Sequence, residues 1–312
     1  MMRAARRRGA AVLVALVVAT LATVIVSGLF WRQFVVLRTV ENRQVDAQMQ
    51  LLLRGALDWA RAILRDQPHQ AYDALSDPWA QPLAPTRLAD LGETSPLAAE
   101  ASLEGGVEDA QGRFNLRNLV GGDGSIVPDP YAAFERLAAS VGAPPGTAQL
   151  VARHLRACFT PASADPVAAA GARPLAPAYP GDLAIVAGID PEAARRLDAF
   201  VTVLDQGGTN VNFNTASPEV MSATLPGLSL ADARALASER NQAYFRDVAD
   251  LQNRLHGRAG GATVTGVSVN SQYFIVRGTV SIGHARRSLQ ALVRRGGTGA
   301  QGTVDILWER DR

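Results

Sequence analysis

The sequence predicts an α+β protein: a long N-terminal transmembrane and amphipathic helix packed on an antiparallel sheet, with a large inserted α-helical domain. Three observations predict this class. Helically spaced apolar residues run without a proline from the N-terminus to Pro68, helical patterns separated by turn signals fill the middle of the chain, and alternating β-branched segments close it. A length of 312 residues suffices for one large or two modest domains, each with its own core.

Composition narrows the functional classes. The formal net charge of +2 is too small to indicate a nucleic-acid-binding protein, and the arginines near the N-terminus account for it alone. The chain contains no lysine, so every fixed cation is an arginine. The single Cys158 excludes an internal disulfide, and we expect it to be a small buried apolar residue.

The N-terminal segment has the composition of a membrane-spanning helix. No residue from 9 to 31 is charged, and about 23 helical residues at about 1.5 Å each suffice to cross a bilayer core. Four arginines precede this run. The positive-inside rule therefore predicts a cytoplasmic N-terminus and an outward-facing remainder.

A cleaved secretory signal is the weaker interpretation of this segment. Signal peptides have a shorter apolar region, of about 7–15 residues, before a small-x-small cleavage site. Here the best candidate site, Val26-Ser27-Gly28, is followed by the bulky Leu29 and Phe30. The sequence therefore favours retention of the apolar helix.

The helical pattern continues past the membrane segment as an amphipathic stretch. Apolar residues recur at three- and four-residue steps among charged ones, and no proline interrupts them before Pro68. The apolar positions are Val36, Val40, Met49, Leu52, Leu53, Ala56, Leu57, Ala60, Ile63 and Leu64. The pattern predicts one helix of roughly 55 residues whose second half lies on a soluble domain.

A short basic leader ending in glycine, an uncharged helix and an amphipathic extension together resemble the type IV pilins and the pseudopilins of type II secretion. The resemblance implies that a prepilin peptidase cuts between Gly9 and Ala10, methylates Ala10 and leaves the helix in place. Most pilins carry glutamate at the fifth mature position, which here is Val14. An unpaired carboxylate is costly in hydrocarbon, and a subunit that enters an assembly first gains nothing from it. Its absence is typical of the K-type minor pseudopilins.

The segment from residue 99 to 120 contains a turn between extended stretches. We expect short strands around Gly105-Gly106, a turn at Asp109–Gly112 and a further extended piece, together forming a hairpin. The run resembles a motif of the K-type family, with Arg117 where the family usually has asparagine. The matching residues are Asp109, Gly112, Arg113, Phe114, Asn115, Leu116 and Leu119. We interpret them as structural, with Asn115 and Asn118 bonding to local backbone groups.

The chain turns helical from residue 126. Before it, residues 66–97 predict a surface connection with one short helix around Pro85–Leu91. The glycine-rich GGDGS at 121–125 lacks the Lys-Ser/Thr of a phosphate loop and predicts an ordinary loop. Helices are expected at Pro130–Ala139 and Pro145–Phe159, followed by a Pro/Ala-rich linker at 160–182.

A short internal sequence repeat follows this linker. Gly-Ile at 188–189 and Gly-Leu at 227–228 each separate two helical patterns. Asp190, Ser217 and Ser229 stand in helix-capping positions, the first two directly before a proline. This repeat predicts paired helical hairpins of the helix-hairpin-helix kind.

These hairpins leave one rival function open. The runs VNFNTA, LPGL and AYFRDVADL also resemble the DNA-binding module of secreted competence proteins, which would make the chain a membrane-anchored DNA-uptake protein. Between residues 182 and 255, however, six arginines are outnumbered by ten acidic residues, and phosphate binding needs positive charge. Each hairpin also lacks the second glycine expected of a phosphate-binding hairpin. We therefore expect no nucleic-acid partner.

Antiparallel strands are predicted at the C-terminal end. Residues 264–269 alternate, Tyr273–Ile282 is β-branched and aromatic, His284–Arg295 alternates again, and Val304–Trp308 forms a last strand. The run from Ser268 to Gly278 again resembles the K-type family. The matching residues are Ser268, Val269, Ser271, Tyr273, Phe274, Val276 and Gly278.

The order of these parts resembles the K-type arrangement, a pilin-like core interrupted by a helical domain. It divides the chain into a prepilin leader (1–9), a transmembrane helix (10–31), the pseudopilin helix and first strands (32–125), an inserted helical domain (126–261) and C-terminal strands (262–312).

The sequence offers little for catalysis, and we expect no enzyme activity. His69, His154, His256 and His284 lie far apart without spaced partners, so zinc sites and catalytic triads have no local support. Ser27 and Ser217 stand in no nucleophile elbow. A third alternative, a membrane-tethered hydrolase, would need a cluster of titratable groups formed only in three dimensions.

The K-type resemblance implies a minor pseudopilin at the tip of the type II secretion pseudopilus, which starts its assembly and supports export of folded proteins across the outer membrane. The implied partners are I- and J-type minor pseudopilins, other pseudopilins, the prepilin peptidase and the inner-membrane secretion machinery. The implied location is a single pass through the inner membrane with a periplasmic soluble domain. No cofactor is required. Calcium in the soluble part is implied without assignable ligands, although a pair such as Asp123 and Asp129 could line a cation site.

Overall fold

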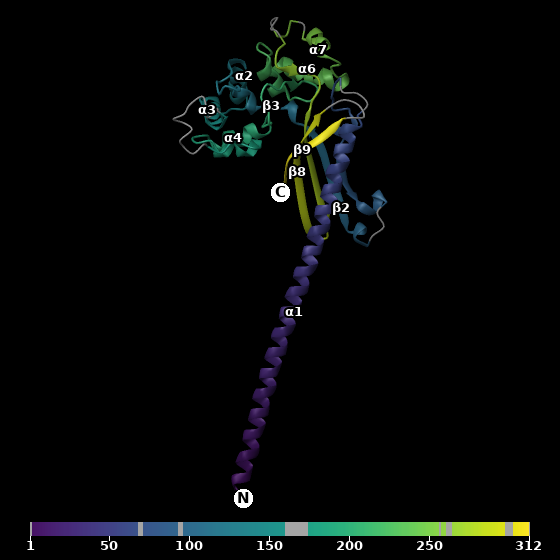
Figure 1. Ribbon diagram of the computed structural model, residues 1–312, viewed down its shortest axis with the longest axis vertical. Coiled ribbons are helices and arrows are strands. Elements are labelled where there is room, and N and C mark those ends of the chain that lie inside the picture. Colours follow the sequence, from purple (N-terminus) through teal and green to yellow (C-terminus); the bar gives the residue numbers. More distant parts are fainter. Residues whose placement is uncertain are drawn as a thin grey trace.

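The computed structural model describes residues 2–67, 71–92, 96–159, 174–255, 257–259, 264–296 and 302–311. Its longest element is helix α1 (Met2–Arg65), which extends from the rest of the molecule as a stalk (Figure 1). The helix is continuous because alanine, leucine, valine and arginine dominate it and no proline occurs before Pro68. The predicted long N-terminal helix is confirmed.

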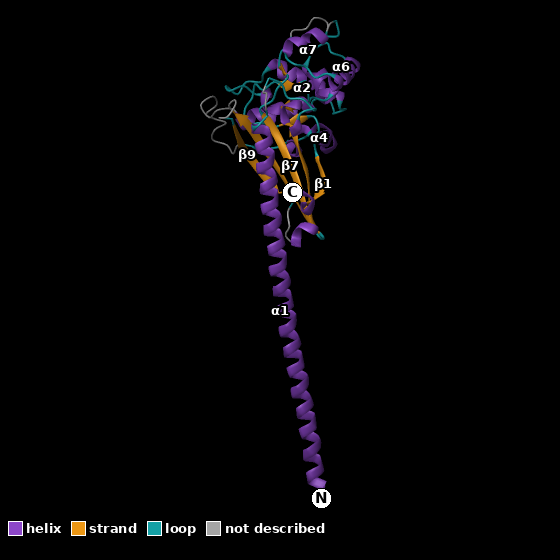
Figure 2. Cartoon of the chain, turned by 90° about the vertical axis from the view of Figure 1, so that its right-hand side faces the viewer, coloured by secondary structure: helices purple, strands orange, loops and turns teal. Residues whose placement is uncertain are grey.

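A five-stranded antiparallel sheet lies against the C-terminal half of α1 (Figure 2), in the order β1-β2-β7-β8-β9. The strands are β1 (Leu83–Arg87), β2 (Ala101–Asp109), β7 (Tyr273–Ile282), β8 (Ala285–Gly296) and β9 (Thr303–Asp311). The strands predicted at 273–282, 284–295 and 304–308 are confirmed. Of the stretch predicted at 264–269, only β6 (Val267–Ser268) is a strand, and it lies outside this sheet. β-branched and aromatic residues suit these positions because they pack well on a pleated, half-buried surface.

Successive side chains along each strand point to opposite faces of the sheet, and α1 covers the face that carries the apolar set. On β7, the buried Val276 and Val280 belong to the cluster that includes α1, whereas the intervening Thr279 bonds to Ser288 of β8. The buried stripe of α1 consists of Met49, Leu53, Leu57, Ala60 and Leu64. Its three- and four-residue spacing places all five side chains on one side of the helix.

Truncating the centre of this stripe is expected to cost about 2–5 kcal/mol of unfolding free energy, because Leu53→Ala leaves a cavity in a packed core. Leu53 is 1% exposed, and a Cβ added at Gly278 would lie 3.4 Å from its Cδ2. Denaturant unfolding of the full chain in mild detergent, followed by tryptophan fluorescence to which the buried Trp79 contributes, measures the loss. The matched variant Leu51→Ala changes a side chain that is 67% exposed and should stay within about 0.5 kcal/mol of the parent. Equal losses in the two variants would contradict this packing.

The helical domain lies at the end of the molecule opposite the N-terminus (Figure 1). Its helices are α2 (Pro128–Ser140), α3 (Thr147–Phe159), α4 (Pro191–Asp198), α5 (Pro218–Thr224), α6 (Leu230–Gln242) and α7 (Val248–Arg254). The first two confirm the helices predicted at 130–139 and 145–159. The predicted linker at 160–182 lies outside the described residues as far as residue 173.

The predicted helix caps are confirmed. Asp190 accepts hydrogen bonds from the backbone N–H groups of Glu192 and Ala193, while Ser217 and Ser229 cap α5 and α6 in the same way. The predicted helix-hairpin-helix repeat stays a prediction. The turn at Gly227 joins two α-helices, but the turn at residue 188 follows a 3-10 helix, η7 (Pro180–Ile185).

The helical domain is inserted into the hairpin formed by β2 and β7. Asp109, the last residue of β2, pairs with Phe274 at the start of β7, so the chain leaves and re-enters the sheet at adjacent positions. The buried cluster of the helical domain runs from Phe114 to Val269. The cluster therefore includes residues before 126 and residues after 261, beyond both ends of the predicted range 126–261.

Two short parallel pairs hold this insertion together. They join β3 (Phe114–Asn115) to β4 (Val201–Thr202), and β5 (Val211–Asn212) to β6 (Val267–Ser268). The hairpin predicted within 99–120 is therefore wrong. β2 continues straight through Gly105-Gly106, and the piece after the turn pairs with a segment far along the chain because that pairing also buries Phe114 in the helical core.

Two further local predictions need correction. The helix expected around Pro85–Leu91 begins as strand β1 and becomes helical only at η2 (Leu88–Leu91), a 3-10 turn, because β1 finds a partner in β2. Cys158 is free and only partly buried near the end of α3, where its Sγ lies 3.6 Å from the carbonyl oxygen of Leu175. Its helical position faces the edge of the core, so it is not the buried apolar residue that its type suggested.

Candidate functional site

The N-terminal part of α1 presents an apolar surface on every side. The large apolar side chains from Val12 to Val40 are 46–69% exposed, Val14 among them at 63%. Among the described residues, one helix is long and apolar enough to cross a membrane, and it is this one. Gly9 and Ala10 lie within α1, and cleavage between them stays a prediction.

A neck of α1 between the apolar span and the sheet also carries large apolar side chains. The uncharged run that ends at Trp31 already fills a bilayer core of about 30 Å. Phe34, Val36, Leu37 and Val40 lie beyond it and are 50–57% exposed. Contiguous exposed apolar surface of this kind is typical of a protein interface.

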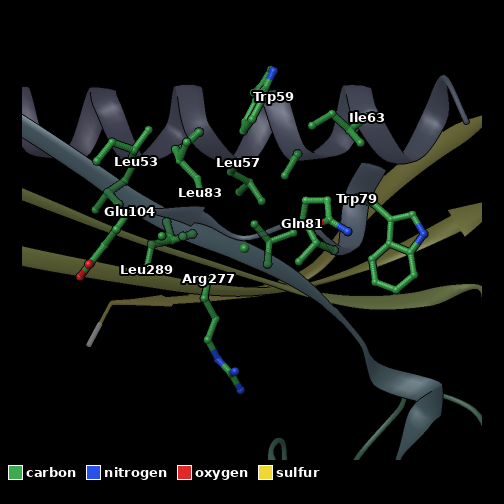
Figure 3. A pocket seen from close by; sticks show the side chains of 18 of the residues that line it. Leu53, Leu57, Trp59, Ile63, Trp79, Gln81, Leu83, Glu104, Arg277 and Leu289 are labelled. Atoms are coloured by element: carbon green, nitrogen blue, oxygen red, sulfur yellow. The ribbon is translucent and has the colours of Figure 1, made fainter. Parts of the chain in front are cut away.

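A groove runs between α1 and the side of the sheet formed by β1 and β2 (Figure 3). It exists because one helix, about 10 Å wide, cannot cover five strands spaced about 4.8 Å apart, and α1 packs mainly over β7 and β8. The apolar and small lining residues are Leu53, Ala56, Leu57, Trp59, Ala60, Ile63, Pro78, Trp79, Leu83, Leu103, Gly105, Gly106, Val107, Val276, Gly278 and Leu289. The groove is therefore suited to an apolar occupant.

The charged groups at the groove already have partners. Glu104 pairs with Arg286, and Arg277 pairs with Glu108. The Trp59 ring stands on the side of α1 away from the sheet, 56% exposed (Figure 3). It widens the apolar surface from the groove onto the outside of the helix.

A second candidate site is a buried polar network where the helical domain meets the sheet, centred on Asp109. One carboxylate oxygen, Oδ2, accepts hydrogen bonds from Thr215 Oγ1 at 2.6 Å and Ser271 Oγ at 2.6 Å. The same oxygen accepts from Asn212 Nδ2 at 2.8 Å, and Oδ1 accepts from the Gln111 backbone N–H at 2.7 Å. Burial raises the pKa of Asp109, and these donors oppose the rise.

The neighbouring asparagines extend this junction. Asn115 Oδ1 accepts from the backbone N–H of Arg117 at 3.0 Å, but also from that of Leu204 at 3.2 Å. Asn118 Oδ1 accepts from the Thr209 N–H at 3.1 Å, and its Nδ2 donates to the Thr209 carbonyl at 2.8 Å. The predicted local role of these two side chains is therefore only part of their role, since both also fix a segment about 90 residues away.

A buried ion pair completes the network. Arg295, at the end of β8, donates to Asp73 Oδ2 at 2.6 Å and to the Ser271 carbonyl at 2.7 Å. The two side chains are 3% and 0% exposed. Burial raises the pKa of Asp73 to about 7, although the Arg295 charge and the Ser271 N–H oppose the rise.

The network joins pieces that the sequence did not connect. Asp109 and Ser271 belong to the predicted motifs, whereas Asp73 and Arg295 belong to none, and sequence reasoning missed both. No local pattern singles them out, because β8 carries four arginines and Asp73 lies eight residues after the end of α1. The arrangement fixes the helical domain on the sheet, and its hydroxyl groups are engaged in hydrogen bonds to Asp109.

Catalytic and metal-binding features are sparse in the part of the chain that the structure describes. Within it, no three His, Cys, Asp or Glu residues come together as a metal site. Asp123 accepts from the N–H and hydroxyl of Ser125 and so shapes its own loop. His154 lies 3.0 Å from the Leu175 carbonyl, while His69 and His256 fall outside the described residues. Calcium binding stays a prediction without assigned ligands.

Comparisons with known proteins agree with this architecture. Two sequence profiles, both described as type II secretion system (T2SS), protein K, match residues 112–206 and 211–270. A "Type II secretion system protein K" of Pseudomonas aeruginosa is 28% identical over 313 residues, covering 94% of this chain and 90% of the relative. One of Klebsiella pneumoniae is 27% identical over 336 residues, covering 98% of this chain and 99% of the relative.

A solved structure has the same fold. It is a chain of the GspK-GspI-GspJ complex from the type 2 secretion system of enterotoxigenic Escherichia coli. The TM-score is 0.64 at 20% sequence identity, over 88% of this chain and 99% of that chain.

Proposed function

Because the chain belongs to the protein K family of type II secretion systems and is a minor pseudopilin, we propose that it forms the periplasmic tip of the pseudopilus. The observation that carries this proposal is the place of the insertion. The helical domain interrupts the β2–β7 hairpin at the end of the molecule farthest from the membrane segment (Figure 1). A domain in that place would obstruct the stacking of a further subunit above it.

The proposed partners are the I-type and J-type minor pseudopilins of the same organism. The structural relative is a K-type protein solved in a complex with GspI and GspJ. In this chain, the exposed apolar neck and the groove beside α1 supply surface for such partners. Other pseudopilins and the inner-membrane secretion machinery would then contact the same helix, α1.

We further propose that the chain enters the fibre first and so starts assembly. Val14 stands where most pilins carry a glutamate, and it belongs to a surface without any charged residue. A leading subunit has no neighbour ahead of it to satisfy a buried carboxylate. The resulting fibre would support export of folded proteins across the outer membrane.

The proposed location is the inner membrane, crossed once by α1, with the N-terminus in the cytoplasm and the sheet and helical domain in the periplasm. The apolar span and the arginines that precede it support this orientation.

The variant Gly9→Val is expected to abolish processing completely. A prepilin peptidase that cuts after glycine would meet a β-branched side chain at the scissile bond. Intact mass and N-terminal sequencing of the protein from its host measure the result, and the parent should begin at an N-methylated Ala10 only when the peptidase is present. The matched control Gly28→Val changes another glycine of α1, where an added Cβ meets nothing within 4 Å, and should be processed normally.

Two other N-termini would contradict the proposal. A parent protein that begins at Met1 in the presence of the peptidase would be a simple membrane anchor. One that begins near Gly28 would be a freed periplasmic protein, and the tip role would fail with it.

A further inference from the structure

The outer end of the apolar span carries a stripe of two aromatic rings and one arginine. Trp31, Phe34 and Arg38 follow at steps of three and four residues, so their side chains lie on one side of α1, roughly opposite Val36 and Val40 of the neck. The centroids of the Trp31 and Phe34 rings are 6.3 Å apart, and the Arg38 guanidinium lies 5.3 Å from the centroid of the Phe34 ring. Trp31 is 69% exposed and Phe34 is 50% exposed. The three side chains therefore contact one another and remain open to an outside partner.

The stripe extends through the height of a lipid headgroup layer. With Trp31 at the boundary of the hydrocarbon core, the Cα atoms of Phe34 and Arg38 lie about 4.5 Å and about 10.5 Å beyond it, at about 1.5 Å per residue. The headgroup layer of one leaflet is about 5–8 Å thick. Helical side chains lean toward the N-terminus, which here is toward the membrane, and Arg38 does so because it contacts the Phe34 ring. Its guanidinium therefore lies at the level of the lipid phosphates.

Glu41 adds an opposite charge beside this guanidinium. Its Oε2 accepts a hydrogen bond from Arg38 Nη1 at 3.1 Å, and the two side chains are 48% and 63% exposed. Because Glu41 comes three residues after Arg38, the cation lies on the membrane side and the anion on the outer side. A guanidinium has five N–H donors in a fork that fits a phosphate, and Glu41 engages one of them. The order of charges therefore complements a headgroup with an inner phosphate and an outer ammonium.

We propose that Trp31, Phe34, Arg38 and Glu41 bind the headgroup of a phospholipid that carries both a phosphate and a primary ammonium, as phosphatidylethanolamine does. The guanidinium of Arg38 binds the phosphate, and the carboxylate of Glu41 accepts hydrogen bonds from the ammonium. The rings of Trp31 and Phe34 lie against the glycerol and the upper acyl chain. The site fixes the depth of α1 in the outward-facing leaflet. This inference rests on the proposed function for the membrane location of α1.

Quenching by brominated lipids tests the depth of the stripe. The full chain is reconstituted in vesicles of phosphatidylethanolamine and phosphatidylcholine, with bromine at one defined position of the phosphatidylcholine acyl chains. Of the four tryptophans, Trp59, Trp79 and Trp308 lie beside or within the sheet, and the variant Trp31→Phe reports their signal alone. We expect the Trp31 signal to be quenched most by bromines next to the headgroup. Strongest quenching by bromines at the chain ends would overturn the site, whereas no quenching at any position would reject the membrane location in the proposed function.

Native mass spectrometry tests the headgroup chemistry. The full chain is purified in mild detergent with equal amounts of phosphatidylethanolamine, phosphatidylcholine and phosphatidylglycerol. We expect the parent to retain phosphatidylethanolamine at least about threefold more than either other lipid, because only this headgroup combines a phosphate with ammonium N–H donors. Arg38→Gln should lower its retention at least about fivefold, and Glu41→Gln should lower it to the level of phosphatidylcholine. The matched control Arg43→Gln removes an exposed arginine about 18 Å beyond Trp31 and should stay within about 1.5-fold of the parent.

Three results of this measurement would overturn the headgroup assignment. Equal retention of the three lipids by the parent, or equal losses for Arg38→Gln and Arg43→Gln, would show a general basic surface. Displacement of the retained lipid by excess inorganic phosphate would show a site for phosphate itself. Arg38, Glu41 and Arg43 are all exposed on α1, so a loss of folding does not explain a difference among their variants. Each of these results leaves the membrane location and the tip role unchanged.

Discussion

Replacing Arg295 with methionine is expected to lower the unfolding free energy by about 3–5 kcal/mol at pH 8, because it leaves Asp73 as a buried charge without its partner. Both side chains are almost fully buried, and the guanidinium reaches Asp73 Oδ2 at 2.6 Å. Gln67 and the Ser271 carbonyl, which also accept from Arg295, would lose their donor. Methionine keeps the length of the side chain, so the loss reports charge and hydrogen bonding more than volume.

The loss should be smaller at pH 5, and the sign follows from the raised pKa of Asp73. Its carboxyl has a pKa of about 7 in the folded protein against an ordinary value of 3.8, so the folded state holds the proton more tightly than the unfolded state. The stabilising contribution of the protonated form is complete below pH 4 and is lost as pH rises through 7. Without Arg295 the charged form is costlier still, which enlarges the difference between pH 5 and pH 8.

Denaturant unfolding of the full chain in mild detergent at both pH values measures these effects, with tryptophan fluorescence as the probe. The double variant Asp73→Asn with Arg295→Met should recover part of the stability at pH 8 and flatten the pH dependence. The neighbouring Arg294→Met breaks a partly exposed pair with Asp205 and should cost less than about 1 kcal/mol. Equal losses of unfolding free energy for Arg295→Met at pH 5 and pH 8 would show that the charge on Asp73 does not cause the loss.

Removing the helical domain is expected to reduce secretion to the level of a strain that lacks the protein. Because Asp109 pairs with Phe274, replacing residues 111–272 with Asn-Gly would close the β2–β7 hairpin with a two-residue turn. α1, the five strands and the groove all lie outside the deleted segment. The variant would therefore keep its anchor and its partner surface but lose the domain proposed to end the fibre.

Secretion of a folded substrate and the number and length of pseudopili measure the outcome. Co-purification with the I-type and J-type partners is the internal control, since a variant that still retains them is folded and inserted. Unchanged secretion and unchanged pseudopilus number would reject the role of the helical domain at the tip. The deletion has to begin before residue 114 and end after residue 269, because a cut at 126 and 261 would expose Phe114, Leu119, Val267 and Val269.

The sequence by itself determined those helices, strands and caps that are encoded by neighbouring residues in the chain. The three- and four-residue spacing of α1, the strand-forming residues of β7 and β8, and the caps Ser217 and Ser229 are each encoded within a few consecutive residues, and all are confirmed. The same local patterns, together with the K-type motifs, predicted an inserted helical domain between the strands. Periodicity is readable from one segment because burial imposes it on each segment separately.

Tertiary structure alone decided how these elements meet. Phe114 and Asn115 pair with Val201 and Thr202 instead of folding back on β2, and Arg295 reaches Asp73 across 222 residues of sequence. The groove exists only because one helix is narrower than the sheet on which it lies. Such contacts join residues with no local pattern in common, since a buried charge or amide is satisfied by whichever partner the folded chain brings within hydrogen-bond distance.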